Sequence, residues 1–233
     1  MGHVHAYDGD GITMRGYRAM PDDPNGAALL VLPAFAGLRA FEMARADRFA
    51  ALGYAVLAVD YYGDGWTADS REAAAAAMAK LNADRAALLC RTEAALAQVS
   101  DWGEKVGALG FCFGGKAVLD MARAGHLDAA VSLHGVYDPP PWTGQEMPPV
   151  LLCHGWNDPL ADPAAFGALA EELEAHSPDW HAVCFGQTGH AFTNPDQVSD
   201  VPGMGYIGRS AARSWVAVEA FLDRILLPSD PST

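Results

Sequence analysis

Apolar residues fall along the chain in short continuous runs, separated by stretches in which apolar positions recur at helical spacing. We predict strands at residues 27–32, 54–59, 106–109, 129–133, 150–153 and 180–185, and the first is apolar throughout, as expected of a strand buried on both faces. Helical spacing predicts helices over residues 39–52, 69–99, 116–123, 163–176 and 206–227. Alternation of this kind is typical of a mostly parallel sheet with helices on both faces, so we predict a single α/β domain.

The remaining segments complete this organisation. Two β-like stretches within residues 3–20 surround Asp8-Gly9-Asp10-Gly11, which predicts a short N-terminal hairpin. Asp69 and Glu72 have the spacing of a capping box before the alanine-rich helix, which we expect to break near residues 82–84. The domain is expected to span residues 1–233, with a core of about 10–227 and a frayed tail at 228–233.

Composition narrows the classes of partner. The net charge of −14 argues against nucleic acid or an anionic membrane surface as a partner. No apolar stretch approaches the roughly 20 residues of a membrane span, and the N-terminal residues lack the pattern of a secretory signal. The four cysteines fall inside helix or strand patterns, with no C-x-x-C spacing. We therefore expect a cytoplasmic protein with reduced thiols, no disulfide and no metal site.

The sequence VGALGFCFGGKA at residues 106–117 joins a predicted strand to a predicted helix through a glycine-rich turn. In this context G-x-S-x-G forms a nucleophile elbow, and here Cys112 occupies the position of the serine. A thiol at a helix N-terminus is shifted toward thiolate, the form that attacks. Cys112 is also compatible with a buried apolar role beside a packing turn, so the assignment depends on the rest of the chain.

Two further residues follow the next strands in the order that such a fold requires. Asp158 lies in the turn HGWND after the strand at 150–153, and His190 lies in QTGHAF after the strand at 180–185. Ligands bind outside the carboxyl ends of parallel strands, so the three side chains are expected to meet there. Imidazole accepts the thiol proton and later protonates the leaving group, and the carboxylate fixes its tautomer. We predict a Cys112–His190–Asp158 catalytic triad.

The runs LGFCFGG, GWND and GHAF, together with the short N-terminal hairpin, resemble the dienelactone hydrolase family of the α/β-hydrolase fold over residues 10–225. The resemblance implies a carboxylic ester or lactone hydrolase with no metal or cofactor, which acts on a small molecule through an acyl-cysteine intermediate. It also implies an oxyanion hole formed by the backbone N–H groups of Phe35 and Phe113. The sequence leaves a monomer and a small homo-oligomer equally open.

Two positions depart from the family pattern. The family's glutamate after the first parallel strand is replaced by Ala34, and its arginine shortly after the catalytic histidine is replaced by Asn194. Arg71 is the alternative cation for a substrate carboxylate, and Tyr62 and Phe192 are predicted to line an aromatic substrate cleft. The connection at residues 135–149 is short where larger relatives insert lids, so we expect an open site.

Two other interpretations remain open at this point. The chain could be a non-catalytic member of the fold that binds a small molecule, or Cys112 could be a redox-sensitive thiol. Residues 110–116 also match the phosphate-binding frame G-x-x-x-x-G-K, although Ala117 stands where Ser or Thr would bind magnesium. In the hydrolase interpretation, Lys116 is expected on the solvated side of its helix.

Overall fold

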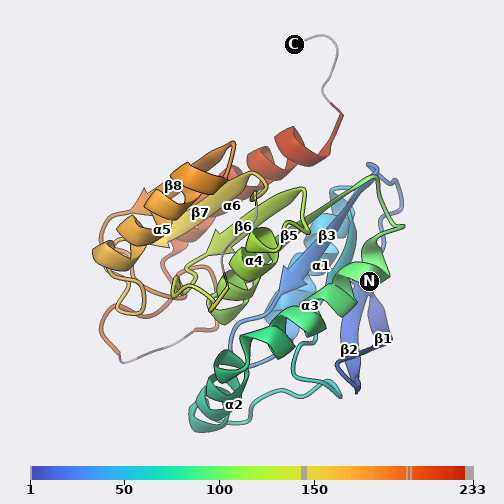
Figure 1. Cartoon of the computed structure of the whole chain (residues 1–233), viewed down its shortest axis with the longest axis horizontal. Helices are drawn as coiled ribbons and strands as arrows, with labels where there is room; N and C mark the ends of the chain where they lie inside the picture. Colours follow the sequence, from blue (N-terminus) through green and yellow to red (C-terminus); the bar gives the residue numbers. More distant parts are fainter. Residues whose placement is uncertain (1, 143–145, 198, 200, 229–233) are drawn as a thin grey trace.

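An eight-stranded sheet forms the centre of the computed structural model, which describes residues 2–142, 146–197, 199 and 201–228. Its strand order is β1-β2-β4-β3-β5-β6-β7-β8 (Figure 1). The strands are β1 (His3–Gly9), β2 (Ile12–Ala19), β3 (Ala27–Leu32), β4 (Ala55–Ala58), β5 (Lys105–Phe111), β6 (Ala129–Leu133), β7 (Val150–Gly155) and β8 (Trp180–Phe185). All neighbours from β4 to β8 run parallel, which confirms the predicted mostly parallel sheet.

The N-terminal hairpin is confirmed as the antiparallel pair β1–β2, and β2 also pairs antiparallel with β4. Its turn is formed by Asp10 and Gly11, which both have positive φ, at 55° and 69°. Aspartate followed by glycine tolerates this backbone, and a turn with positive φ at both central residues follows the twist of the strands.

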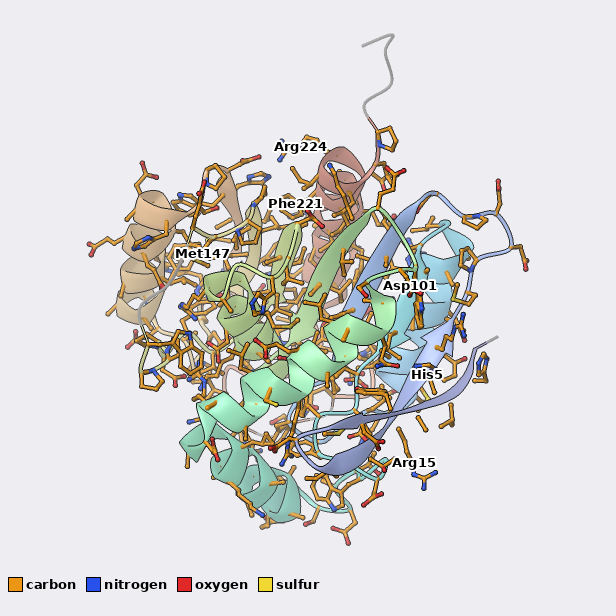
Figure 2. All side chains as sticks on the ribbon, turned by 45° about the vertical axis from the view of Figure 1, so that its right-hand side comes forward. His5, Arg15, Asp101, Met147, Phe221 and Arg224 are labelled. Carbon is orange, nitrogen blue, oxygen red and sulfur yellow. The ribbon has the colours of Figure 1, made fainter. Side chains whose placement is uncertain are left out.

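Helices cover both faces of the sheet (Figure 1). They are α1 (Ala40–Ala51), α2 (Arg71–Ala83), α3 (Arg85–Val99), α4 (Phe113–Arg123), α5 (Pro163–His176) and α6 (Gly208–Leu226). Residues of α1 and α6 belong to the core cluster on one face, and residues of α3, α4 and α5 to the cluster on the other. Met147 lies in the second cluster and Phe221 in the first (Figure 2).

β3 shows how one apolar run serves both layers. All six of its residues are at most 1% exposed. Leu30 and Leu32 pack into the cluster with α4, whereas Leu29 and Val31 pack into the cluster with α1 and α6. Alternation of side chains along a strand explains why an uninterrupted apolar run is needed at the centre of the sheet.

The alanine-rich stretch is two helices, with the break at Asp84 that the sequence predicts. Asp84 ends α2 and caps α3, because its Oδ1 accepts a hydrogen bond from the Ala87 N–H at 3.0 Å. The first cap differs from the prediction. Ser70 is the N-cap residue of α2, and its hydroxyl accepts a hydrogen bond from the Ala73 N–H at 3.1 Å, so the capping box assigned to Asp69 is wrong.

Lys116 is also placed differently from the prediction, since it is only 4% exposed. Its Nζ donates to Oδ1 of Asn82 at 2.6 Å and forms an ion pair with Asp138. Arg85 pairs with both Asp120 and Asp138 in the same cluster. These contacts join α2, α3 and α4 to the exposed Asp138 in the connection after β6.

Two further expectations concern the surface and the chain end. Cys184 lies in a strand, as its sequence pattern predicts, but that strand is the edge strand β8 and the thiol is exposed. Nearly all of the predicted frayed tail, residues 228–233, lies outside the described residues, which end at Pro228. Across the described ranges, no helix combines the length and apolar character needed to cross a membrane.

Candidate active site

Cys112 occupies a sharp turn between the central strand β5 and helix α4. Its φ and ψ are 54° and −113°, a backbone conformation that non-glycine residues rarely adopt. Its N–H donates to the Leu133 carbonyl at 3.1 Å, and its own carbonyl accepts from the Lys116 N–H at 3.2 Å. Hydrogen bonds to the end of β6 and to the first turn of α4 thus fix this strained residue, as in a nucleophile elbow.

Glycine is required on both sides of Cys112 because backbones approach closely there. A Cβ on Gly110 would lie 2.2 Å from the Gly114 carbonyl oxygen, and one on Gly114 would lie 2.3 Å from the Leu32 oxygen. Both separations are impossible for real atoms. The G-x-C-x-G pattern therefore encodes the contact between strand and helix that this turn needs.

The same turn does not offer a phosphate-binding loop. Helix α4 begins at Phe113, directly after Cys112, so the glycines lie inside the turn and helix and form no loop around a ligand. Lys116, which would reach the phosphates in such a site, is buried in the ion cluster with Asp138. The nucleotide-binding interpretation has no support in this geometry.

Asp158 and His190 come together in the two loops that follow β7 and β8. Nδ1 of His190 lies 2.7 Å from Oδ2 of Asp158, and the side chains are 5% and 0% exposed. The other carboxylate oxygen of Asp158 accepts a hydrogen bond from the Leu160 N–H at 2.8 Å. The carboxylate thus has a fixed orientation and fixes that of the imidazole.

The backbone around His190 is anchored on both sides. Its N–H donates to the Gly203 carbonyl at 2.7 Å, and its carbonyl accepts from the Gly205 N–H at 3.0 Å. The loop after β7 packs closely on the same segment, since a Cβ on Gly155 would lie 2.4 Å from the Gly189 oxygen. We call residues 186–207 the histidine loop.

The thiol of Cys112 lies on the other side of the imidazole. Burial alone would raise the pKa of the thiol, but the charge of His190 and a hydrogen bond to it lower the pKa below its ordinary value. Burial would lower the pKa of His190, but Cys112 and Asp158 together raise it to about 10. Within the described part of the chain, Nε2 of His190 is buried and has no other hydrogen-bond partner, which leaves it to face the thiol.

Two backbone N–H groups are directed at the same sulfur. They belong to Phe113, at the start of α4, and to Phe35, in the loop after β3, and both contribute to lowering the pKa of the thiol. These are the two groups that the sequence predicts for an oxyanion hole. We call residues 33–39 the oxyanion loop.

His134, directly after β6, is a buried, hydrogen-bonded residue beside His190. Its ring centroid is 5.2 Å from that of His190, and its Nε2 shares a hydrogen bond with the Thr193 hydroxyl at 2.8 Å. Burial and then the neighbouring charge of His190 hold its pKa well below the ordinary value. A neutral ring here excludes water without competing for the proton on His190.

The residues predicted to bind substrate are placed less uniformly. Arg71 is exposed at the start of α2, and its guanidinium lies 3.8 Å from the Met204 sulfur, on the histidine loop. Tyr62 is partly exposed, and its hydroxyl donates to the Phe35 carbonyl at 2.9 Å. Phe192 does not reach the surface, because its ring is fully buried against Phe185 and His134.

The chain matches the model of the dienelactone hydrolase family over residues 14–226. The crystal structure of a dienelactone hydrolase-like promiscuous phosphotriesterase from metagenomic libraries superposes on this chain with a TM-score of 0.87. The two sequences are 31% identical, and the superposition covers 97% of this chain and 98% of the other.

Two curated proteins are also similar. A probable 2-oxo-3-(5-oxofuran-2-ylidene)propanoate lactonase of Bradyrhizobium sp is 23% identical over 180 residues, which cover 71% of this chain and 73% of the relative. An uncharacterized protein of Caenorhabditis elegans is 33% identical over 125 residues, which cover 51% of this chain and 79% of the relative.

The match to the family model extends from β2 to the end of α6 and includes the elbow and both loops that carry Asp158 and His190. The chain therefore belongs to the dienelactone hydrolase family and has the α/β-hydrolase fold of a carboxylic ester or lactone hydrolase.

Proposed function

We propose that the protein hydrolyses small activated esters or lactones through an acyl-cysteine intermediate on Cys112. One observation carries the proposal, namely that the thiol lies between the imidazole of His190 and the N–H groups of Phe113 and Phe35. The imidazole can accept the thiol proton, and the two N–H groups can stabilise the negative oxygen that forms on the attacked carbonyl.

Each group then has one chemical role. The Cys112 thiolate attacks the carbonyl carbon, and the two N–H groups stabilise the oxyanion of the tetrahedral intermediate. As the intermediate collapses, His190 gives its proton to the leaving alkoxide. His190 next removes a proton from water, which attacks the acyl-cysteine and releases the acid, while Asp158 keeps Nδ1 protonated and directs Nε2 at the thiol. These steps need neither a metal nor a cofactor.

We propose that the substrate is a small lactone that carries a carboxylate. Arg71 reaches the histidine loop and is the cation that we propose for a substrate carboxylate. The name of the Bradyrhizobium relative describes a substrate with both a carboxylate and a lactone ring. The tetrahedral intermediate can expel either the thiolate or the alcohol, and a thiolate is a good leaving group. Esters of alcohols or enols with a low pKa are therefore favoured, because their leaving group departs before the thiolate does.

Hydrolysis of p-nitrophenyl acetate with and without prior iodoacetamide tests the nucleophile. We expect turnover to fall in step with alkylation of Cys112, measured by mass spectrometry of the labelled peptides. Cys90 and Cys184 are exposed thiols, and labelling at either should leave turnover unchanged. Cys112→Ala should abolish turnover without loss of folding, and Cys184→Ala is the matched control.

Rapid labelling of Cys112 with no turnover on this ester or on simple lactones would contradict the proposal. That result would favour a protein that binds a small molecule or senses oxidants through Cys112. A Cys112→Ala variant that remained active would remove the triad altogether.

A further inference from the structure

A second buried carboxylate lies beside the oxyanion loop. Glu42, in the first turn of α1, is only 3% exposed. Its Oε2 accepts a hydrogen bond from the Arg39 N–H at 3.1 Å, and its Oε1 accepts one from the Ala34 N–H at 3.4 Å. Within the described part of the chain it has no Lys or Arg within ion-pair distance. As the N3 residue, Glu42 caps the start of α1 through the Arg39 N–H, but its bond to the Ala34 N–H reaches outside the helix to the beginning of the oxyanion loop.

The two N–H groups that Glu42 holds lie on either side of Phe35 in the oxyanion loop. The carbonyls of the same loop are held by tyrosines. The Tyr61 hydroxyl lies 2.7 Å from the Pro33 oxygen and 3.1 Å from the Ala34 oxygen, and the Tyr62 hydroxyl donates to the Phe35 oxygen at 2.9 Å. The Phe35 N–H is thus left free to be directed at Cys112.

We propose that Glu42 is a positioning residue for the oxyanion hole, whose carboxylate holds the loop so that the Phe35 N–H meets the reacting oxygen. The proposal rests on the function proposed above. Glu42 does not touch the substrate, and it acts through the backbone of residues 34–39. A donor displaced by a fraction of an ångström loses much of its effect on the transition state, because the stabilisation depends on donors fixed before the reaction.

Ionisation of Glu42 matters because only the carboxylate can accept from both N–H groups. Burial raises the pKa of Glu42 to about 7, although hydrogen bonds from its own N–H and from those of Arg39 and Ala34, and the charge of Arg39, act in the opposite direction. The other titratable group that acts across this contact is Tyr61. Burial raises the pKa of its hydroxyl well above the ordinary value, so it stays a neutral donor. The loop is therefore fully held only above about pH 7.

Glu42→Gln tests the proposal, because the amide keeps the shape of the protonated acid and has a single acceptor oxygen. With p-nitrophenyl acetate we expect kcat to fall about 10- to 100-fold, below the full cost of removing an oxyanion-hole donor, with KM changed little. The wild-type kcat should rise as pH increases through about 7, and this rise should be absent in the variant. Alkylation of Cys112 by iodoacetamide should slow far less than kcat, with at most a slight shift of its acidic limb to higher pH, because the Phe35 N–H makes the smallest of the contributions that lower the pKa of the thiol.

Glu72→Gln is the matched control, since Glu72 is an exposed glutamate in the first turn of α2 and p-nitrophenyl acetate has no carboxylate for the adjacent Arg71. Tyr62→Phe provides a second variant that leaves Glu42 intact if Glu42→Gln does not fold. It should lower kcat by a smaller factor, again with a much smaller effect on alkylation of Cys112.

Three outcomes would overturn the proposal. The kcat of a folded Glu42→Gln variant could stay within twofold of the wild type, or alkylation could slow in proportion to kcat, which would mean that Glu42 acts on the thiol. If Glu42→Gln fails to fold, an unchanged kcat in Tyr62→Phe would overturn it. A wild-type protein that hydrolyses no ester would instead refute the proposed function.

Discussion

At the scale of the residue, the site depends on charges that are held where water reaches them poorly. The pKa of His190 is raised to about 10 and that of Cys112 is lowered, each mainly by the other against the effect of burial. Both shifts favour the thiolate–imidazolium form of the pair. In the proposed mechanism the thiol is therefore nearer to its attacking form than a serine would be, since a serine must lose its proton during attack.

Asp158→Asn should weaken this pair. The hydrogen bond and the charge of Asp158 help to raise the pKa of His190, so the variant should have a less stable imidazolium and a smaller fraction of thiolate. We expect kcat/KM to fall about 100-fold or more. The acidic limb of the Cys112 alkylation profile should move to higher pH. Asp196→Asn, at an exposed position of the histidine loop, is the control, and an unmoved profile in Asp158→Asn would argue against this role.

Single residues were predictable where a local pattern dictates their place. Cys112, Asp158 and His190 all follow parallel strands, and the sheet brings the ends of β5, β7 and β8 to one edge. Glu42 had no such signal. Its burial depends on how α1 docks against the oxyanion loop, and a glutamate three residues after Arg39 looks the same on an exposed helix. The prediction that Phe192 lines the cleft was wrong because an aromatic side chain in a loop can pack into the core as readily as into a cleft.

At the scale of the element, the elbow is defined by how closely β5, α4 and the oxyanion loop approach. A Cβ on Gly114 would lie 2.3 and 2.4 Å from the carbonyl oxygens of Leu32 and Pro33. The same contact that lets the helix leave the strand also sets the distance between Cys112 and the loop that carries Phe35.

Gly114→Ala should therefore lower both stability and kcat. The oxyanion loop must move to admit the methyl group, and such overpacking costs roughly 1–3 kcal/mol. Thermal unfolding and p-nitrophenyl acetate turnover would measure the two effects. Gly167→Ala is the control, because Gly167 lies inside α5 with open space around its Cβ position and alanine there should stabilise by about 0.5–1 kcal/mol. Equal unfolding temperatures for Gly114→Ala and the wild type would contradict this argument.

The elements themselves were largely predictable, and their exceptions have a common cause. The apolar run of β3, the hairpin turn at Asp10-Gly11 and the break at Asp84 are local signals. Burial of Lys116 is not, because it depends on Asn82 and Asp138, which come from α2 and from the connection after β6. A charged residue can be placed in the interior only when its partners are known.

At the scale of the whole molecule, Arg71 brings together two parts of the chain that are far apart in sequence. It belongs to α2, whereas Met204, which it contacts, belongs to the histidine loop. Arg71→Ala should raise KM for a lactone that bears a free carboxylate by about two- to fivefold, since an exposed ion pair contributes up to about 1 kcal/mol. KM for p-nitrophenyl acetate should not change.

Lys80→Ala removes a charge from the same helix at an exposed position away from its start and is the matched control. An equal effect of the two substitutions on KM would mean that only the overall charge is felt. An unchanged KM for the anionic lactone in Arg71→Ala would remove Arg71 from the binding site.

The place of β5 at the middle of the sheet divides the proposed machinery by chain order. Phe35, Glu42 and Tyr62, which form or steady one side of the oxyanion hole, all precede Cys112. The second donor, Phe113, directly follows Cys112, and Asp158 and His190, which handle the proton, come later in the chain. In the sheet, β3 and β4, which lead to Phe35 and Tyr62, lie on one side of β5, and β7 and β8, which lead to Asp158 and His190, lie on the other. Changes in the first half of the chain can thus retune which carbonyl is accepted while the acid–base apparatus stays intact. Within one fold, substrate choice and proton transfer can diverge separately over evolution.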